Sequence, residues 1–215
     1  MRCALACGLL ALAALVATPV AAADPPVRGT YAEGKGGLAW IVPCGSGKRL
    51  ELMDSDAARE LRKHFAALAA GHVRSMIVEV AGRREGDAFQ ADAVLRVQTG
   101  GLGCSEDLRR VVAKAGGHNP SWSMVFDDTR LAFQRVGDRA PAVFPPLGLE
   151  KRSDRFEFKG ETESARIYVV LLKERCDDPL ANALLPYRAE ITFAWRTDAQ
   201  PGVYRGCAYL GNAAR

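Results

Sequence analysis

Apolar and polar residues alternate along much of this chain with a period of two, which predicts β-strands. The clearest case is 187–195, where Arg188, Glu190 and Thr192 separate apolar or aromatic neighbours. In 89–97 the alternation places Phe89, Ala91, Ala93, Leu95 and Val97 on one face and Gln90, Asp92 and Arg96 on the other. Further strands are expected at 28–33, 38–43, 48–53, 73–80, 122–126, 130–136, 156–158, 166–172 and 203–210.

One segment has helical spacing instead. Its apolar stripe lies within 55–70 and comprises Ala57, Leu61, Phe65 and Leu68. Asp54 or Ser55 is the expected N-cap, and Gly71 ends the helix. A second, short helix is expected at 105–115.

The order of these elements predicts a mainly β protein with two small β-barrel or sandwich-like domains. Residues 24–115 form the first, with one α-helix, and residues 116–215 the second, with Gly116-Gly117 at the boundary. The proline-rich stretch 140–148 is expected to be a loop anchored by Val143, Phe144 and Leu147.

The first 23 residues have the pattern of a secretory signal peptide. An apolar segment from Cys3 to Ala17 precedes Pro19 and a run of small residues, so cleavage is expected before Asp24. The alternative is an uncleaved anchor, but the apolar segment is short for a membrane span. Neither Cys3 nor Cys7 follows the apolar segment, as a lipoprotein would require. We therefore expect a soluble protein of the bacterial periplasm.

Four cysteines then remain: Cys44, Cys104, Cys176 and Cys207. An even number in an exported chain predicts two disulfides, for which three pairings exist. Because two cysteines fall in each half, Cys44–Cys104 and Cys176–Cys207 would each crosslink one domain. Loops of this size contribute on the order of 4 kcal/mol each in the chain-entropy model. The competing interpretation is a metal or redox site, but the chain has no C-x-x-C.

Composition narrows the function classes further. The formal net charge is +4, with acidic and basic residues interspersed, which disfavours a dedicated nucleic-acid binder. After the first 23 residues, no stretch is apolar enough for a transmembrane helix. Local basic pairs such as Lys48-Arg49 and Arg109-Arg110 indicate a solvated surface, or a face for anionic lipid or glycan if several gather.

Catalytic and metal-binding patterns are weak. Gly45-Ser46-Gly47-Lys48 lacks the other positions of a phosphate loop and predicts a turn beside a disulfide. None of His64, His72 and His118 has a partner at metal-ligand spacing. The acidic pairs Asp127-Asp128 and Asp177-Asp178 are expected to cap turns, because adjacent strand residues face opposite ways. The sequence thus predicts no catalytic residues, no metal and no cofactor.

Three segments of the second half, within 117–210, carry a resemblance. They are Gly117-His118-Asn119-Pro120-Ser121-Trp122, Cys176-Asp177-Asp178-Pro179-Leu180 with Leu185-Pro186-Tyr187, and Gly206-Cys207-Ala208. Their spacing resembles G-x-E-P-x-W, C-x-D-x-M, Y-P-Y and G-C-A in a family of uncharacterised bacterial periplasmic or lipoprotein-like envelope proteins. Asn119, Leu180 and Leu185 depart from that pattern, so an acid- or methionine-dependent activity would be lost here.

Two interpretations of these matched residues stay open. In the structural one, Trp122 is a core aromatic beside the Cys176–Cys207 bond, Pro186 starts a strand, and Gly206 leaves room for the disulfide. In the functional one, Trp122, Asp178 and Tyr187 surround a ligand pocket.

More weakly, residues 28–100 resemble small β-barrel domains of envelope lipoproteins linked to copper homeostasis and surface stress. Gly29-Thr30-Tyr31, the strand before Cys44, the helix after Asp54 and the stretch 78–82 carry this resemblance in their order and spacing. The copper-associated C-x-x-C of some such proteins is absent.

The leading functional hypothesis is a non-enzymatic envelope protein that binds a protein, cell-wall or small-molecule partner. One alternative is a copper-linked stress or homeostasis protein, which the second resemblance implies. Another is an inhibitor of a wall-degrading enzyme such as lysozyme, because a rigid loop on a small disulfide-bonded barrel can plug a cleft.

Overall fold

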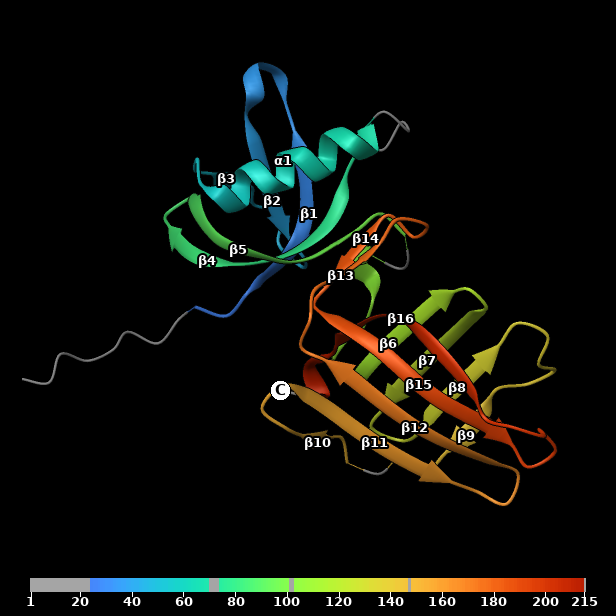
Figure 1. The fold of residues 1–215 in the computed structure, drawn as a ribbon. Helices are drawn as coiled ribbons and strands as arrows, with labels where there is room; N and C mark the ends of the chain where they lie inside the picture. The colour runs from blue at the N-terminus through green and yellow to red at the C-terminus, as the bar shows by residue number, and fades with distance from the viewer. Residues whose placement is uncertain (1–23, 70–73, 101–102, 147, 215) are drawn as a thin grey trace, which may run out of the picture.

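The computed structural model describes residues 24–69, 74–100, 103–146 and 148–214. These residues form two β-sheets and one α-helix, which confirms the predicted mainly β fold class (Figure 1). The predicted signal peptide and its cleavage site, together with His72, Gly71 and Leu147, lie outside the described residues. No helix of the described residues is long and apolar enough to cross a membrane.

The first sheet contains a closed five-stranded barrel, hereafter the barrel. Its strands are β1 (Val27–Glu33), β2 (Ala39–Pro43), β3 (Leu50–Leu52), β4 (Met76–Glu85) and β5 (Ala88–Gln98). They follow the order β5-β3-β2-β1-β4, and pairing of β4 with β5 closes the ring. A 3-10 turn, η1 (Lys35–Gly37), connects β1 to β2. Closure pairs both sides of each strand, so the barrel needs no second sheet to cover its edges.

The helix α1 (Asp56–Ala69) packs against the barrel (Figure 1). The Ser55 hydroxyl accepts a hydrogen bond from the Ala58 backbone N–H at 3.1 Å, so Ser55 is the N-cap. Ala57, Leu61 and Phe65 from the predicted stripe are buried in the barrel core. Phe65 contacts Tyr31 edge-to-face at 5.4 Å between ring centroids.

The second sheet, hereafter the curled sheet, has nine antiparallel strands. They are β6 (Val111–His118), β7 (Ser121–Asp127), β8 (Leu131–Arg135), β9 (Ala142–Phe144), β10 (Glu150–Lys151), β11 (Arg155–Glu161), β12 (Ala165–Leu172), β15 (Tyr187–Trp195) and β16 (Gly202–Leu210). Their order is β10-β11-β12-β15-β16-β6-β7-β8-β9, which leaves β10 and β9 as the two edges. Short 3-10 turns, η2 (Gly103–Ser105) and η3 (Asn212–Ala214), flank it in sequence.

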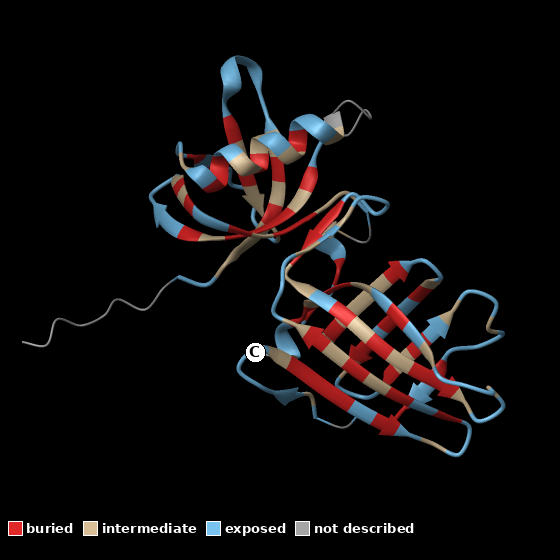
Figure 2. Cartoon of the chain, in the orientation of Figure 1, coloured by how far each residue is buried: buried red, intermediate tan, exposed pale blue. Residues whose placement is uncertain are grey.

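Buried positions alternate along the strands of the curled sheet (Figure 2), and many of the buried side chains in its core are aromatic. Phe126 of β7 meets Phe158 of β11 at 5.0 Å, and Phe133 of β8 meets Phe193 of β15 at 4.6 Å between centroids. These contacts join strands that are not hydrogen-bonded neighbours. The sheet is therefore folded onto itself by side-chain packing.

A short hairpin from the second half of the chain joins the barrel. Its strands are β13 (Cys176–Asp178) and β14 (Ala183–Leu185). Ala183 and Leu184 pair with Gln98 and Val97 of β5, and Leu184 is buried in the barrel core. The Cys176–Cys207 disulfide attaches the hairpin to β16 of the curled sheet. The hairpin thus connects both sheets.

The other disulfide joins Cys44, just after β2, to Cys104 in η2. Both bonds have the pairing that the placement of the cysteines favoured. Gly116 and Gly117 lie inside β6, and the hairpin returns to the barrel, so the chain crosses between the sheets more than once. The division at residues 115 and 116 stays a prediction.

The short helix expected at 105–115 is wrong. Of the expected helix, Ser105 is the last residue of the 3-10 turn η2, and the residues from Val111 onward belong to the strand β6. Val111 and Ala113 are buried and their neighbours less so, which is strand alternation. The stretch 140–148 also contains a strand, β9, whose Phe144 is fully buried while Val143 is exposed.

The alternation expected along β5 fails at Ala93 and Leu95. Register shifts against β4 occur between Glu79 and Val80 and between Ala81 and Gly82. Each extra residue reverses which face the following side chains occupy. Val94 is therefore buried in the barrel core, and Ala93 is exposed.

Candidate functional site

A cavity of about 410 Å³ lies where the barrel, the hairpin and the curled sheet meet; we call it the junction cavity. Gln98 and Gly100 come from the end of β5, and the hairpin supplies Asp178, Ala181, Ala183 and Leu185. The curled sheet and the loop before it supply Glu106, Gly116, Gly117, His118, Trp122, Cys207 and Tyr209. A cavity between separately packed units is a common location for a small-molecule site.

Two of the three residues proposed for a ligand pocket line this cavity. Trp122 of β7 and Asp178 of β13 are brought together although they lie far apart in the sequence. Tyr187 is placed elsewhere: its ring meets Phe156 at 5.7 Å and packs against the core of the curled sheet. The structural role expected for Trp122 also holds, because it is 5% exposed and its indole N–H donates to the Arg205 carbonyl at 3.2 Å.

Asp178 is held in a fixed orientation at the cavity wall. Its Oδ1 accepts hydrogen bonds from the backbone N–H groups of Leu180 at 3.1 Å and Ala181 at 3.0 Å. Its Oδ2 lies 3.2 Å from Nε2 of His118. The Asp178 side chain is 13% exposed and that of His118 is 42% exposed. The turn-capping role predicted for Asp178 is therefore confirmed, with one carboxylate oxygen directed to His118.

Glu106 is the centre of a buried ionic network on another wall of the cavity. Its Oε1 accepts from Lys114 Nζ at 2.7 Å and from the Tyr209 hydroxyl at 2.5 Å. Its Oε2 accepts from Arg28 and Arg96, both at 3.2 Å. Three cations and one hydroxyl therefore surround a single carboxylate, which compensates its charge fully.

This network joins the two sheets. Arg28 belongs to β1 and Arg96 to β5, whereas Lys114 and Tyr209 belong to the curled sheet. Arg96 is 1% exposed, its guanidinium lies 3.5 Å above the Tyr209 ring, and it donates to Gln98 Oε1. The side of β5 that bears Arg96 is thus covered by the curled sheet rather than by water.

The network also perturbs protonation equilibria. Burial alone would raise the pKa of Glu106, but hydrogen bonds from Lys114 and Tyr209 and the charge of Arg96 lower it below its usual value. Burial and the hydrogen bond to Glu106 raise the pKa of the Tyr209 phenol. Glu106 is therefore a stable carboxylate and Tyr209 a neutral donor at neutral pH.

Glycines allow the strands to approach closely beside the cavity. A Cβ on Gly206 would lie 2.0 Å from the Gly116 carbonyl oxygen, and one on Gly117 would lie 2.5 Å from Trp122 Nε1. The expectation that Gly206 leaves room for the disulfide stays a prediction. Its small size is required by the neighbouring β6 backbone, since the pairing of β16 with β6 brings Gly116 against it.

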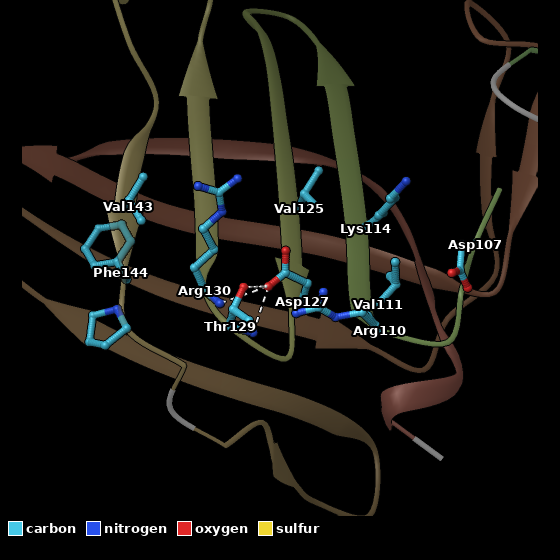
Figure 3. A pocket seen from close by; sticks show the side chains of 11 residues that line it. Asp107, Arg110, Val111, Lys114, Val125, Asp127, Thr129, Arg130, Val143 and Phe144 are labelled. Atoms are coloured by element: carbon cyan, nitrogen blue, oxygen red, sulfur yellow. Dashed lines mark hydrogen bonds between the residues drawn. The ribbon is translucent and has the colours of Figure 1, made fainter.

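A larger depression of about 710 Å³ lies on the outer face of β6 to β9 (Figure 3). Lys114, Val125 and Arg130 point outward there, with Val143 on β9 beside them. Asp127 Oδ1 accepts from the backbone N–H groups of Thr129 and Arg130, which confirms its turn-capping role. Most charges of this surface are already paired, as Lys114 is with Glu106 and Arg110 with Asp128.

The remaining predicted positions have local structural roles. His64 Nε2 lies 3.7 Å from Glu60 on the same helix. Residues 45–48 connect β2 to β3 beside the Cys44–Cys104 bond, and the Ser46 hydroxyl accepts from the Lys48 N–H. Among the described residues, no group of three or more His, Cys, Asp or Glu side chains could hold a metal ion.

Glu106 and Arg96 are cavity or network residues that the sequence pattern did not identify. Arg96 stands between Leu95 and Val97, and an arginine within an apolar strand is a signal for a buried partner. Glu106 has no comparable signal, since it lies in a loop and its partners come from four separate strands.

Comparison with known proteins identifies no family for this chain: no family model, curated protein or solved structure matches it.

Proposed function

We propose that this chain is an exported, non-enzymatic binding protein of the cell envelope that takes a small ligand in the junction cavity. The observation that carries the proposal is the convergence of Trp122 and Asp178 on one cavity built from three parts of the chain. Its volume, about 410 Å³, falls within the range of small-molecule sites.

Export is supported by the sequence of residues 1–23 and by the two disulfides, which persist in oxidising compartments. We expect the protein in the periplasm, with a mature N-terminus at Asp24. Mass spectrometry of an osmotic-shock fraction tests this. A chain that retains Met1, or that remains with the spheroplasts, contradicts it.

Binding at the cavity is tested with Ala181→Trp, which adds a large side chain at the cavity wall. Ala181 is exposed in the hairpin turn, so the substitution leaves the cores intact. Leu180→Trp is the matched control, because the neighbouring Leu180 is 73% exposed and does not line the cavity. Each protein is incubated with a periplasmic extract of small molecules, desalted, and examined by native mass spectrometry.

We expect the wild type and Leu180→Trp to retain the same small molecule and Ala181→Trp to lose at least tenfold in occupancy. Equal occupancy in Ala181→Trp, or no retained molecule in any of the three proteins, overturns the cavity as the binding site. Recovery of the molecule with an altered mass overturns the non-enzymatic part of the proposal.

A further inference from the structure

The two carboxylates of the junction cavity differ in how their charge is compensated. Glu106 contacts Arg28, Arg96 and Lys114, so its charge is more than neutralised. Asp178 has one ionisable contact among the described residues, His118, and an imidazole carries a positive charge only when protonated. The described residues that line the cavity include no lysine or arginine.

Asp178 is also prepared to accept a further hydrogen bond. Two backbone N–H groups of the hairpin turn fix Oδ1, while the one polar contact of Oδ2 within the described part of the chain is His118. A carboxylate oxygen has two lone-pair sites, so Oδ2 can accept from a second donor. Because the side chain is 13% exposed, water compensates its charge less well than at the open surface.

The other walls of the cavity are largely apolar. Trp122, Leu185 and Ala183 line it together with Cys207 of the disulfide. The Trp122 N–H is already used by the Arg205 carbonyl, and the Tyr209 hydroxyl by Glu106. The side chains present few free donors for an anionic ligand, whereas the apolar walls suit a short hydrocarbon body.

We propose that the junction cavity binds a small organic amine, with its ammonium group on Asp178 and its apolar body against the wall of Trp122 and Leu185. The proposal rests on the function proposed above and names its ligand class. An ammonium supplies both the missing counter-charge and the donor for Oδ2. A neutral sugar supplies donors without the charge, and a carboxylate ligand meets like charge.

Three probes of equal chain length separate the effects of a positive, a neutral and a negative head group. They are hexylammonium, hexan-1-ol and hexanoate, titrated calorimetrically at pH 7.5 and low ionic strength. We expect hexylammonium to bind at least tenfold more tightly than hexan-1-ol, and hexanoate to give no binding heat. An N-acetylglucosamine oligomer is included as the glycan probe, and we expect no binding.

Asp178→Asn keeps an oxygen for the Leu180 and Ala181 N–H groups, so the hairpin turn is retained while the charge is removed. It should weaken hexylammonium binding at least tenfold and leave hexan-1-ol unchanged. Asp177→Asn is the matched control, because the adjacent exposed Asp177 does not line the cavity. Circular dichroism of each variant verifies the fold.

Equal affinity for hexylammonium and hexan-1-ol, or unchanged ammonium binding in Asp178→Asn, overturns the amine assignment. Either outcome leaves the cavity itself open to a separate test. If a probe or the glycan competes with the small molecule that the wild type retains, the junction cavity is still the binding site. The absence of binding heat with every probe at millimolar concentration also overturns the assignment of an amine ligand. The Ala181→Trp experiment tests separately whether the cavity is the binding site.

Discussion

The barrel and the curled sheet solve the problem of sheet edges in different ways. Hydrogen bonding between β4 and β5 closes the barrel, whereas β9 and β10 remain open edges of the curled sheet. The barrel core is mostly aliphatic, with three buried aromatic side chains, whereas the core of the curled sheet has eight, among them Phe133, Phe158 and Phe193. A sheet without hydrogen-bonded closure depends more on large side chains that span its two halves.

The edges of the curled sheet are protected by sequence as well as by length. β10 has two residues and β9 three, and prolines at 141, 145 and 146 flank β9. Proline removes a backbone donor, so another strand pairs poorly there. The barrel needs no such protection around its ring, but it accepts the hairpin on β5 beyond the point where β3 ends.

The largest loss of stability is expected from truncating an aromatic side chain that holds the two halves of the curled sheet together. Phe133 is fully buried and contacts Phe193, Trp122 and Tyr204. Phe133→Ala should lower the free energy of unfolding by about 3–5 kcal/mol, through lost burial and the cavity left behind. Chemical denaturation measures this, and hydrogen exchange should rise first in β8 and β15.

Val136→Ala is the control, because Val136 is 78% exposed, and its effect should stay within about 0.5 kcal/mol. A cost below about 1 kcal/mol for Phe133→Ala contradicts closure by aromatic packing.

The next largest effect concerns the ionic network that joins the two regions. Glu106→Gln leaves Arg28, Arg96 and Lys114 without their shared carboxylate, and should cost about 3 kcal/mol at neutral pH. Because the folded-state pKa of Glu106 is lowered, its stabilisation is present above the ordinary carboxyl pKa and is lost as the pH falls through the folded value.

The difference between the wild type and Glu106→Gln should therefore shrink on acidification below about pH 4. Unfolding curves from pH 7 to pH 3 measure it. Glu150→Gln, at an exposed carboxylate paired with Arg152, should show almost no difference. A pH-independent gap for Glu106→Gln would show that its charge is not the stabilising feature.

The smallest expected effect lies in the barrel, at the N-cap of α1. Ser55→Ala removes the acceptor for the Ala58 N–H and should cost about 1 kcal/mol, measured as a shift in the denaturation midpoint. Ser75→Ala, at an exposed position before β4, is the control. A larger loss than for Phe133→Ala would mean that α1 controls the stability of the whole chain.

Local patterns in the sequence predicted elements whose burial follows a simple period. The strand at Tyr187–Trp195, the aromatic face of β7 and the stripe of α1 were predicted because each side chain's environment repeats along its own element. Features that depend on a neighbour were missed. The bulges in β5 arise from its pairing with β4, and the hairpin strands are too short to carry a pattern.

The candidate site divides in the same way. Trp122 and Asp178 were identified from their motifs, but Tyr187 was grouped with them only because it follows the same motif in sequence. In the fold Tyr187 is the first residue of β15, and its side chain packs on Phe156 and the core of the curled sheet instead of the junction cavity. Gly206 was explained by the neighbouring cysteine, and the adjacent β6 backbone supplies a further reason for its size, because a Cβ there would lie 2.0 Å from the Gly116 carbonyl oxygen.

The sequence by itself determined the mainly β class, the single long helix with an N-cap at Asp54 or Ser55, and the supply of four cysteines for two disulfides. Each follows from short-range periodicity or composition, which requires no knowledge of distant contacts. Only the tertiary structure decided that Glu106 gathers three cations and that Asp178 faces His118 beside Trp122. Those groups come from separate strands, and nothing in local spacing specifies which strands become neighbours.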